Sequence, residues 1–423
     1  MMLFYSLFLS CLLCAAAVTA RTVSGAQVVL EDDHLVTDAL AQRIHGLSLL
    51  YPDPVDLYKA VDPAGAADLD EPRLLRIPGL DGTQWMTEGD KLGLRRQGVK
   101  FIDVTETQDL GVRNAARVQA ASGNATYPDI SYRDQVKDVI SKLSTDYMLD
   151  ILETMTGFYN RYYKSDNGEK ASDWLFTKIK DIVKESNTSS SLSVVKFGHS
   201  WQQSSVIATF HPANWSADTP TVIIGAHLDS INQWFPLLRA PGADDDASGT
   251  VTILEAFRSL LASNFTPQYL VEFHWYSAEE GGCLGSRDVA AAYESQGRTV
   301  RGMLQYDMTA YVKQGTTPTL TMITSDVDPK MTEYGLKLAK EYTDIPVQGR
   351  DLFAGAGSDH MSWGEAGYPV ACATEADPKT LGDPYLHTTN DKIDLPNGEF
   401  SVEHARDLSK LAVAFAVELG GWA

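Results

Sequence analysis

The chain has 423 residues, with 35 Lys and Arg against 56 Asp and Glu, and it carries a formal net charge of −21. Its 44% hydrophobic and 22% charged residues are typical of a globular protein rather than a disordered or fibrous one. The excess of acid argues against nucleic acid or an anionic membrane as a partner, because both are polyanions that require a basic surface. The charge favours solubility without indicating a function.

Residues 1–20 are typical of a secretory signal peptide. The apolar run 3–13 is too short to span a bilayer, and small residues follow it up to Ala20. A membrane anchor is the alternative, although no other apolar run approaches 18 residues. We therefore expect the protein to be secreted and extracellular.

If the protein is exported, its glycosylation triplets and its cysteines become relevant. Four Asn-X-Ser/Thr triplets are candidates for glycosylation, at Asn124, Asn187, Asn214 and Asn264. Two of the four cysteines lie in the signal, which leaves Cys283 and Cys372. These two form either a disulfide or a pair of buried thiols, and the sequence does not decide between them.

Residues 21–125 differ in texture from the rest of the chain. They hold several prolines and many acidic residues, with only short apolar segments. We interpret 21–125 as a propeptide that an activating protease removes, so that the chain is made as a zymogen. A small permanent N-terminal domain is the alternative. A propeptide would act as a chaperone, an inhibitor or both.

Residues 126–423 show an alternation of helix and strand patterns. Strands are expected at 221–225, 269–277, 302–306, 320–324 and 369–374, and helices at 247–263, 285–296, 329–343 and 401–419. Strands alternating with helices predict a single α/β catalytic domain. Its central sheet would be mixed, mostly parallel, and covered by helices on both faces.

Histidines and carboxylates follow several of these strands, where an α/β sheet collects its ligands. They are His227, Asp229, the run 244–246, the pair 279–280, Asp307 and His387. Each has an ordinary explanation: a structural histidine, a helix cap or a solvated turn. Together they would crowd many carboxylates, which is costly without a cation. Histidine and carboxylate without thiolate suit catalytic Zn²⁺, and five ligands would support two ions about 3.5–4 Å apart.

Five short motifs stand in the order found in one enzyme family. They are His-Leu-Asp-Ser at 227–230, Pro-Gly-Ala-Asp-Asp-Asp-Ala-Ser-Gly at 241–249, Ala-Glu-Glu at 278–280, Asp-Met-Thr at 307–309 and His-Thr-Thr at 387–389. Over roughly 133–423 the chain closely resembles the secreted zinc aminopeptidases of the bacterial and fungal leucyl aminopeptidase type. The resemblance implies a three-layer zinc-peptidase fold and a co-catalytic pair of zinc ions.

The resemblance also implies a set of metal ligands. Asp245, the middle aspartate of its run, would bridge the two zinc ions. His227 and Asp307 would complete one zinc, and Glu280 and His387 would complete the other. The flanking aspartates of the run would cap the helix or structure the loop.

Two further carboxylates take catalytic roles under the same resemblance. Glu279 falls on the general base, and Asp229 on the carboxylate that orients His227. The implied enzyme is a metalloprotease, a hydrolase that removes the N-terminal residue from peptides with a free N-terminus. We expect it to work as a monomer.

The family's apolar specificity pocket falls on Met308, Ile323, Phe353, Cys372 and Leu386, which favours large apolar N-terminal residues such as Leu. Phe353 and Gly357 stand where many relatives carry two bonded cysteines, so this loop is unlocked here. Other activities remain open. They are glutaminyl cyclase, carboxypeptidase or aminoacylase activity, and a receptor-like ectodomain without metals.

Overall fold

The computed structural model describes residues 33–115, 126–186, 191–353 and 355–423. The expected signal peptide and the sequons at Asn124 and Asn187 lie outside these residues. Within the described part of the chain, no helix is long and apolar enough to cross a membrane.

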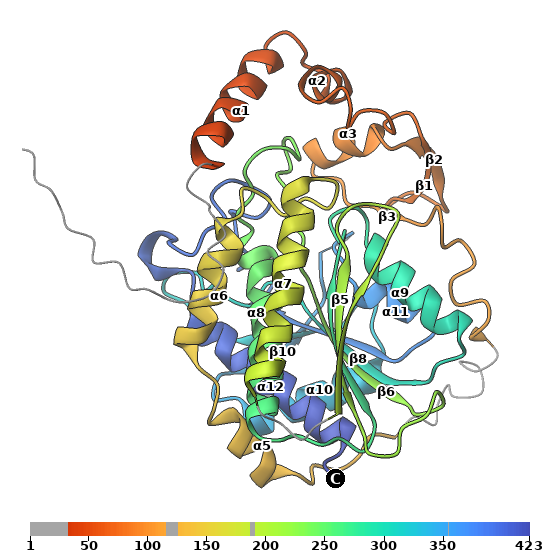
Figure 1. Cartoon of the computed structure of the whole chain (residues 1–423), viewed down its shortest axis with the longest axis vertical. Helices are drawn as coiled ribbons and strands as arrows, with labels where there is room; N and C mark the ends of the chain where they lie inside the picture. The colour runs from red at the N-terminus through yellow and green to blue at the C-terminus, as the bar shows by residue number, and fades with distance from the viewer. Residues whose placement is uncertain (1–32, 116–125, 187–190, 354) are drawn as a thin grey trace, which may run out of the picture.

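An eight-stranded mixed sheet forms the centre of the molecule (Figure 1). Its strands are β4 (Ser191–Phe197), β5 (Ser205–His211), β6 (Thr221–His227), β7 (Leu270–Tyr276), β8 (Val300–Tyr306), β9 (Leu320–Ile323), β10 (Val347–Arg350) and β11 (Val370–Glu375). They lie in the order β10-β9-β11-β8-β6-β7-β5-β4. The four central strands β11, β8, β6 and β7 run parallel, whereas β5 and β4 add antiparallel strands at one side. The mixed, mostly parallel sheet that the sequence predicts is confirmed.

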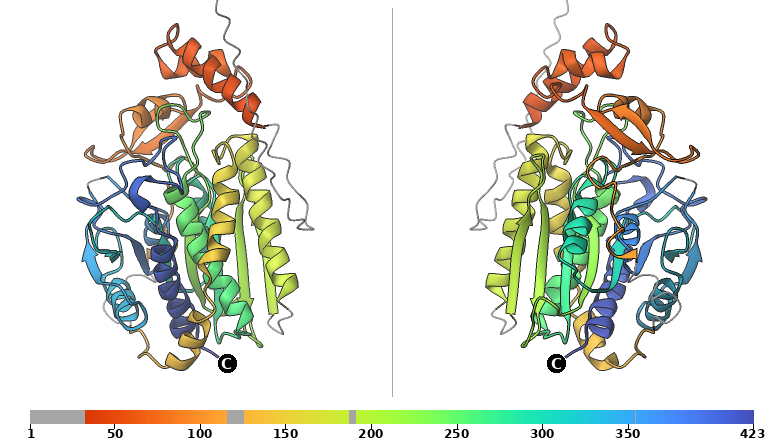
Figure 2. Two further views of the ribbon diagram at one scale, coloured as in Figure 1. Left: turned by 90° about the vertical axis from the view of Figure 1, so that its left-hand side faces the viewer. Right: turned by 90° about the vertical axis from the view of Figure 1, so that its right-hand side faces the viewer.

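Helices cover both faces of this sheet (Figure 2). The helices are α5 (Arg133–Ile140), α6 (Thr145–Gly157), α7 (Asp166–Glu185), α8 (Gly249–Ala262), α9 (Leu284–Ser295), α10 (Pro329–Tyr342), α11 (His360–Glu365) and α12 (Val402–Gly420). Helices α8 and α12 pack on β6 from one side, and α11 packs on β8 and β11. Residues of β6 alternate between two apolar clusters: Val222 and Ile224 join the core around α8 and α12, and Ile223 joins the core around α9 and α11. This period of two identifies a sheet buried on both faces.

The N-terminal segment, residues 33–115, folds as a separate small layer over one end of the large sheet (Figures 1 and 2). Its elements are α1 (Asp33–Ser48), α2 (Pro54–Val61), β1 (Pro72–Arg76), β2 (Gln84–Thr87), α3 (Asp90–Arg96) and β3 (Ile102–Asp103). The three strands form an antiparallel sheet in the order β2-β1-β3. Leu57, Tyr58 and Leu92 pack around Phe235 of the large domain. The N-terminal segment is therefore docked on the rest of the chain through apolar contacts.

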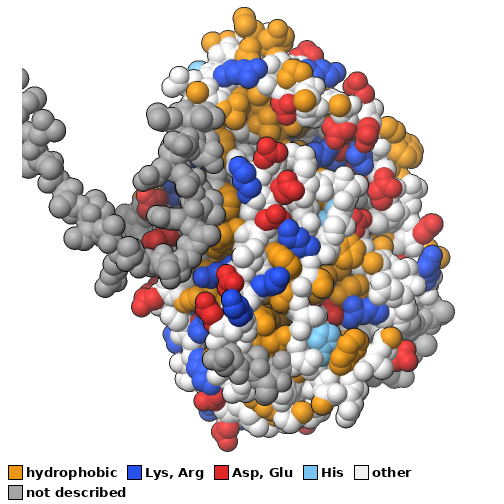
Figure 3. All heavy atoms as spheres, in the orientation of Figure 1, with side chains coloured by type: hydrophobic (Ala, Val, Ile, Leu, Met, Phe, Trp, Pro, Cys, Tyr) orange, Lys and Arg blue, Asp and Glu red, His pale blue; other side chains and the backbone are white. Residues whose placement is uncertain are grey.

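Charges on the surface are mixed. On the face shown in Figure 3, acidic and basic side chains are interspersed over the helices. The ion pair between Lys142 and Asp138, at 2.8 Å, is one exposed example on α5 and the turn after it. The net charge of −21 is therefore not gathered into a single acidic field on this face.

Candidate metal centre

The predicted site residues meet at the carboxyl ends of the central strands. His227 ends β6, Glu279 and Glu280 follow β7, and Asp307 follows β8. These three strands are parallel neighbours, so their carboxyl ends lie at the same edge of the sheet. Asp245 comes from the irregular helical turn η1 (Ala243–Ser248), just before α8, and His387 comes from the loop between β11 and α12.

Asp245 joins two histidines from opposite sides. Its Oδ1 lies 3.0 Å from Nε2 of His227, and its Oδ2 lies 2.9 Å from Nε2 of His387. Glu280 Oε2 is 3.1 Å from the same nitrogen of His387, and Asp307 Oδ1 is 3.8 Å from that of His227. The structure therefore brings all five predicted ligands together, with Asp245 shared between two groups.

Asp246 also lies near His227 and Asp307. One ligand atom from each of these three residues lies within 4.8 Å of the other two. The carboxylate of Asp246 is already engaged, however. Oδ2 accepts a hydrogen bond from the backbone N–H of His227 at 3.1 Å, and Oδ1 accepts from Gly249 at 2.9 Å and Met308 at 3.1 Å. Asp246 therefore braces the strand ends and the start of α8, which supports its predicted role in the loop.

Asp391 is a residue whose role the sequence does not reveal. Its two oxygens accept the backbone N–H groups of Asp244 and Asp245, at 2.7 and 3.1 Å. Asp244 in turn accepts from the N–H groups of Ala310 and Tyr311, at 2.9 and 3.1 Å. The loop that carries Asp245 is thus held on both sides by buried carboxylates. The sequence shows Asp391 four residues after His387, but it gives no sign of this partner.

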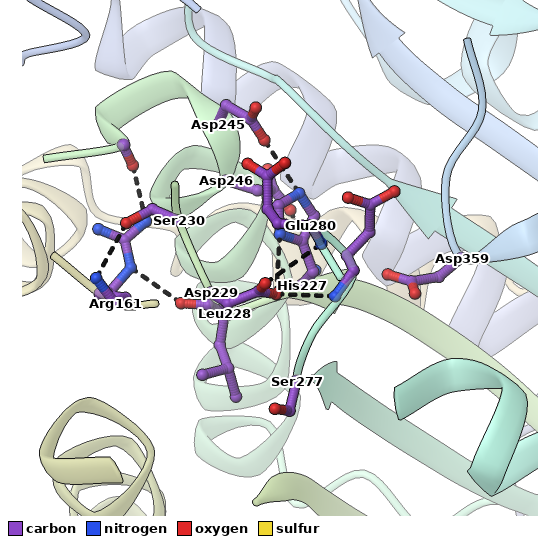
Figure 4. A network of polar contacts seen from close by, with 12 residues as sticks. Arg161, His227, Leu228, Asp229, Ser230, Asp245, Asp246, Ser277, Glu280 and Asp359 are labelled. Atoms are coloured by element: carbon purple, nitrogen blue, oxygen red, sulfur yellow. Dashed lines mark hydrogen bonds and ion pairs between the residues drawn. The ribbon is translucent and has the colours of Figure 1, made fainter. Parts of the chain in front are cut away.

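Asp229 links two strand ends (Figure 4). Its Oδ1 lies 3.5 Å from Nδ1 of His227 and accepts the N–H of Glu279 at 3.0 Å. Its Oδ2 accepts the N–H of Glu280 at 3.2 Å. A single fully buried carboxylate therefore positions the imidazole of one ligand and the backbone of the next two site residues.

Arg161 is a second residue that holds the site in shape (Figure 4). Its buried guanidinium donates to the carbonyl oxygens of Leu228 at 2.8 Å, of Gly242 at 2.8 Å and of Pro241. Leu228 follows His227, and Pro241 and Gly242 precede Asp245, so Arg161 joins the two ends of the loop between β6 and η1.

The carboxylates of the centre raise the pKa values of both histidines, which shows that they favour a positive charge there. Burial opposes protonation of His227, but the carboxylates around it, Asp246 first, raise its pKa well above the usual range. For His387, burial again opposes protonation, and Glu280 and its neighbours raise the pKa to about 9. Three buried polar atoms of the centre have no hydrogen-bond partner among the described residues. They are the two ring nitrogens of His227 and Oε1 of Glu280. Buried nitrogen and carboxylate donors of this kind fit Zn²⁺.

Glu279 lies beside the metal ligands and faces open space. It is half-buried and lines two cavities that meet at the site. Burial, together with nearby carboxylates, raises its pKa well above the ordinary value. The Sγ of Cys283 donates to Oε1 of Glu279 at 3.5 Å. This position and pKa are compatible with a group that takes up and releases a proton.

A cavity of about 400 Å³ extends from the metal ligands into the large domain. All five residues predicted for the specificity pocket line it: Met308, Ile323, Phe353, Cys372 and Leu386. A second cavity of about 390 Å³ is bordered by Glu279, Glu280 and His387, and on its other side by the N-terminal segment.

Two further predictions concern the cysteines and the sequons, which are not among the predicted metal ligands. Cys283 and Cys372 are both buried and unpaired in the described part of the chain. Asn214 and Asn264 are exposed, as an acceptor of glycans must be.

Comparison with known proteins identifies the family. Residues 205–412 match the family described as Peptidase family M28. The chain is 43% identical over 350 residues to leucine aminopeptidase 1 of Trichoderma harzianum, covering 80% of this chain and 86% of that one. It is 41% identical over 348 residues to the protein of the same name in Colletotrichum graminicola, covering 80% and 83%. The crystal structure of the LapA aminopeptidase of Legionella pneumophila matches with a TM-score of 0.70 and 28% identity, over 83% of this chain and 99% of that one. The chain therefore belongs to peptidase family M28 and is a metallo-aminopeptidase of the zinc aminopeptidase type.

Proposed function

We propose that the protein is a secreted exopeptidase that holds two zinc ions and removes large apolar residues, such as Leu, from the N-terminus of peptides. The observation that carries the two-metal proposal is the position of Asp245. Its two oxygens lie within 3.0 Å of nitrogens from two histidines that belong to different elements. A carboxylate between two histidines is the arrangement expected of a bridging ligand.

The ligands divide into two sets around this carboxylate. His227 and Asp307 would hold one zinc ion, and Glu280 and His387 the other, with Asp245 common to both. When bound, the two ions would lower the pKa of a coordinated water and polarise the carbonyl of the peptide bond to be cleaved.

Glu279 would carry the proton in this reaction. As general base it would accept a proton from the attacking water and then deliver it to the nitrogen of the leaving peptide. Its side chain lines the space where the water and the peptide bond must meet.

The apolar cavity would receive the side chain of the N-terminal residue. Its volume of about 400 Å³ lies in the range of pockets for small ligands, and the five residues predicted for it are mainly apolar. The unlocked loop that carries Phe353 borders it. The carboxylates and metals at its mouth would receive the free α-amino group and so restrict cleavage to the N-terminal bond.

Several further proposals concern the chain before it becomes active. We propose that residues 1–20 direct export, that 21–125 act as a propeptide for an activating protease, and that the mature monomer comprises 126–423. Asn214 and Asn264 would carry glycans, since both side chains are exposed.

A pair of substrates tests the exopeptidase proposal. We expect the mature protein to hydrolyse Leu-p-nitroanilide and to leave N-acetyl-Leu-p-nitroanilide intact, because the acetyl group removes the free amine. An enzyme that cleaves the blocked substrate equally well would contradict this proposal and favour an endopeptidase or aminoacylase mode.

A further inference from the structure

One lysine of the N-terminal segment reaches the metal centre. Lys100 is half-buried and borders both cavities that open on the site. One of these cavities is lined by Glu280 and His387, and the other by Asp245 and Asp307, while Glu279 lines both. Lys100 therefore borders the region that the two cavities share beside the predicted site.

On both sides of Lys100, the N-terminal segment is fixed to the loop that carries the site residues. Before it, Arg95 donates from Nη2 to the carbonyl oxygen of Glu280 at 2.6 Å. After it, the N–H of Asp103 donates to the carbonyl oxygen of Gly282 at 3.1 Å. These two bonds bracket Lys100, so its position follows from how the segment docks.

Gly282 makes this close approach possible. Its φ of +104° is one that side-chain-bearing residues rarely adopt, and a Cβ there would lie 2.8 Å from the backbone nitrogen of Asp103. The loop is thus shaped to accept β3 of the N-terminal segment against it. The contact between Gly282 and Asp103 is therefore a specific backbone contact and not merely apolar packing.

A lysine amine ordinarily carries a positive charge at neutral pH. Four carboxylates border the same cavities as Lys100: Glu279, Glu280, Asp245 and Asp307. An ammonium group facing this set of carboxylates resembles one end of a peptide substrate, which also brings a primary amine to them.

We propose that Lys100 presents its side-chain amine at the place where this aminopeptidase receives the amine of its substrate, and so blocks the site while the N-terminal segment is attached. This inference rests on the function and the propeptide proposed above. Lys100 is not itself a substrate, since its amine is followed by four methylene groups and no peptide bond lies beside it. It would occupy the amine position without offering a bond to cleave.

The claim is specific to the amine, because Val99 and Phe101 also line the first cavity and would block it by bulk alone. Lys100→Met removes the charge and keeps nearly the same length, and Lys100→Arg keeps the charge. Lys59→Met is the matched control: Lys59 lies on α2, its side chain is 46% exposed, and it contacts only Asp70 at 3.6 Å among the described ion pairs.

The experiment uses the full chain before cleavage, with mass spectrometry to show that it is intact. Hydrolysis of Leu-p-nitroanilide is measured, together with binding of L-leucinamide by calorimetry. We expect Lys100→Met to raise kcat/KM of the intact chain, and to tighten L-leucinamide binding, by at least about tenfold. Lys100→Arg and Lys59→Met should stay at the level of the unaltered intact chain. After limited proteolysis removes the segment, all four proteins should be equally active.

Two results would overturn the proposal. If intact Lys100→Met is as inactive as the unaltered chain, while its trimmed form is active, the block is steric and the amine is not its cause. If the unaltered intact chain is as active as the trimmed enzyme, the segment does not block the site at all. Loss of all activity in every trimmed protein would instead reject the proposed aminopeptidase reaction, so the two failures are distinguishable.

Discussion

The chemistry of this protein depends on a few carboxylates whose neighbours give them different tasks. Asp245 faces two histidines, whereas both oxygens of Asp246 accept hydrogen bonds from backbone N–H groups. Asp229 accepts from the N–H groups of both Glu279 and Glu280. Residue type alone does not separate a ligand from a brace, and the hydrogen bonds of each oxygen do.

Glu279→Gln tests the general base. We expect kcat to fall by about 10²–10⁴, because the amide cannot accept a proton, while KM and zinc content stay close to their original values. Steady-state kinetics with Leu-p-nitroanilide and metal analysis of the same preparation would measure both. Near-normal turnover in this variant would remove Glu279 from the role.

At the scale of the element, the site depends on how loops are held at the ends of β6, β7 and β8. Arg161 joins the start of the loop after β6 to the end of that loop, before η1, through three carbonyl oxygens. These carbonyl oxygens are buried, and a buried carbonyl without a hydrogen-bond donor lowers the stability of the fold.

Arg161→Met should therefore destabilise the domain. We expect a loss of about 3–5 kcal/mol in the free energy of unfolding, because three buried carbonyl oxygens lose their donor and each unpaired group costs about 1–3 kcal/mol. Urea denaturation of the mature protein with zinc in excess would measure it. Arg133→Met is the control, because Arg133 is 51% exposed and pairs with Glu341, so its loss should cost within about 0.5 kcal/mol. Equal effects of the two substitutions would contradict the proposed role of Arg161 in holding this loop.

The sequence predicts some elements well and misses others for physical reasons. The predicted helix at 329–343 corresponds to α10 (Pro329–Tyr342), and the predicted strand at 221–225 to β6, because both have strong apolar patterns. Strand β4 is missed since Ser191, Ser193 and Lys196 interrupt its apolar residues at the edge of the sheet. Strand β10 is missed because it has four residues, three of them Gln, Gly and Arg.

The site follows the same division. Its ligands stand in short motifs at strand ends, which a single sequence displays. The braces do not, since the contact of Asp391 with Asp244 and Asp245 joins residues about 150 positions apart. The sequence also gives no sign of Lys100, because only the docked fold brings the N-terminal segment to the carboxylates of the predicted site.

At the scale of the whole molecule, the N-terminal segment is joined to the large domain by buried charges. Glu88 contacts Lys91 at 2.9 Å and Arg73 at 3.0 Å within the segment, and Lys164 at 3.0 Å across the boundary. Tyr163 also donates to Glu88 at 3.2 Å. A segment held in this way should remain bound after the chain is cut, until it is degraded or displaced.

Glu88 gives this association a pH dependence. Burial raises its pKa, but Lys91 and Lys164 outweigh burial and hold it well below the usual range. A lowered pKa in the docked state means that the contribution is complete above the ordinary pKa of about 4.3 and is lost as the pH falls below it. The cut segment should therefore stay bound between about pH 5 and 7, which lies above the ordinary Glu pKa of about 4.3, and dissociate more readily as the pH falls below about 4.3.

Glu88→Gln tests this account of docking. We expect the cut segment to dissociate at least about tenfold more readily at pH 7, since Lys164 loses one of its two charged partners and keeps only Asp68. Size-exclusion chromatography of the nicked protein would measure this. Glu71→Gln is the matched control in the same segment, because the side chain of Glu71 is 57% exposed. Equal retention of the segment in both variants would show that Glu88 does not hold it.

The number of zinc ions in the mature protein tests the central claim most directly. Metal analysis after gel filtration should find two zinc ions per chain, and Asp245→Asn should lose tight binding of both, because each ion shares that carboxylate. A single zinc ion in the unaltered protein, or two retained in Asp245→Asn, would contradict a centre bridged by Asp245.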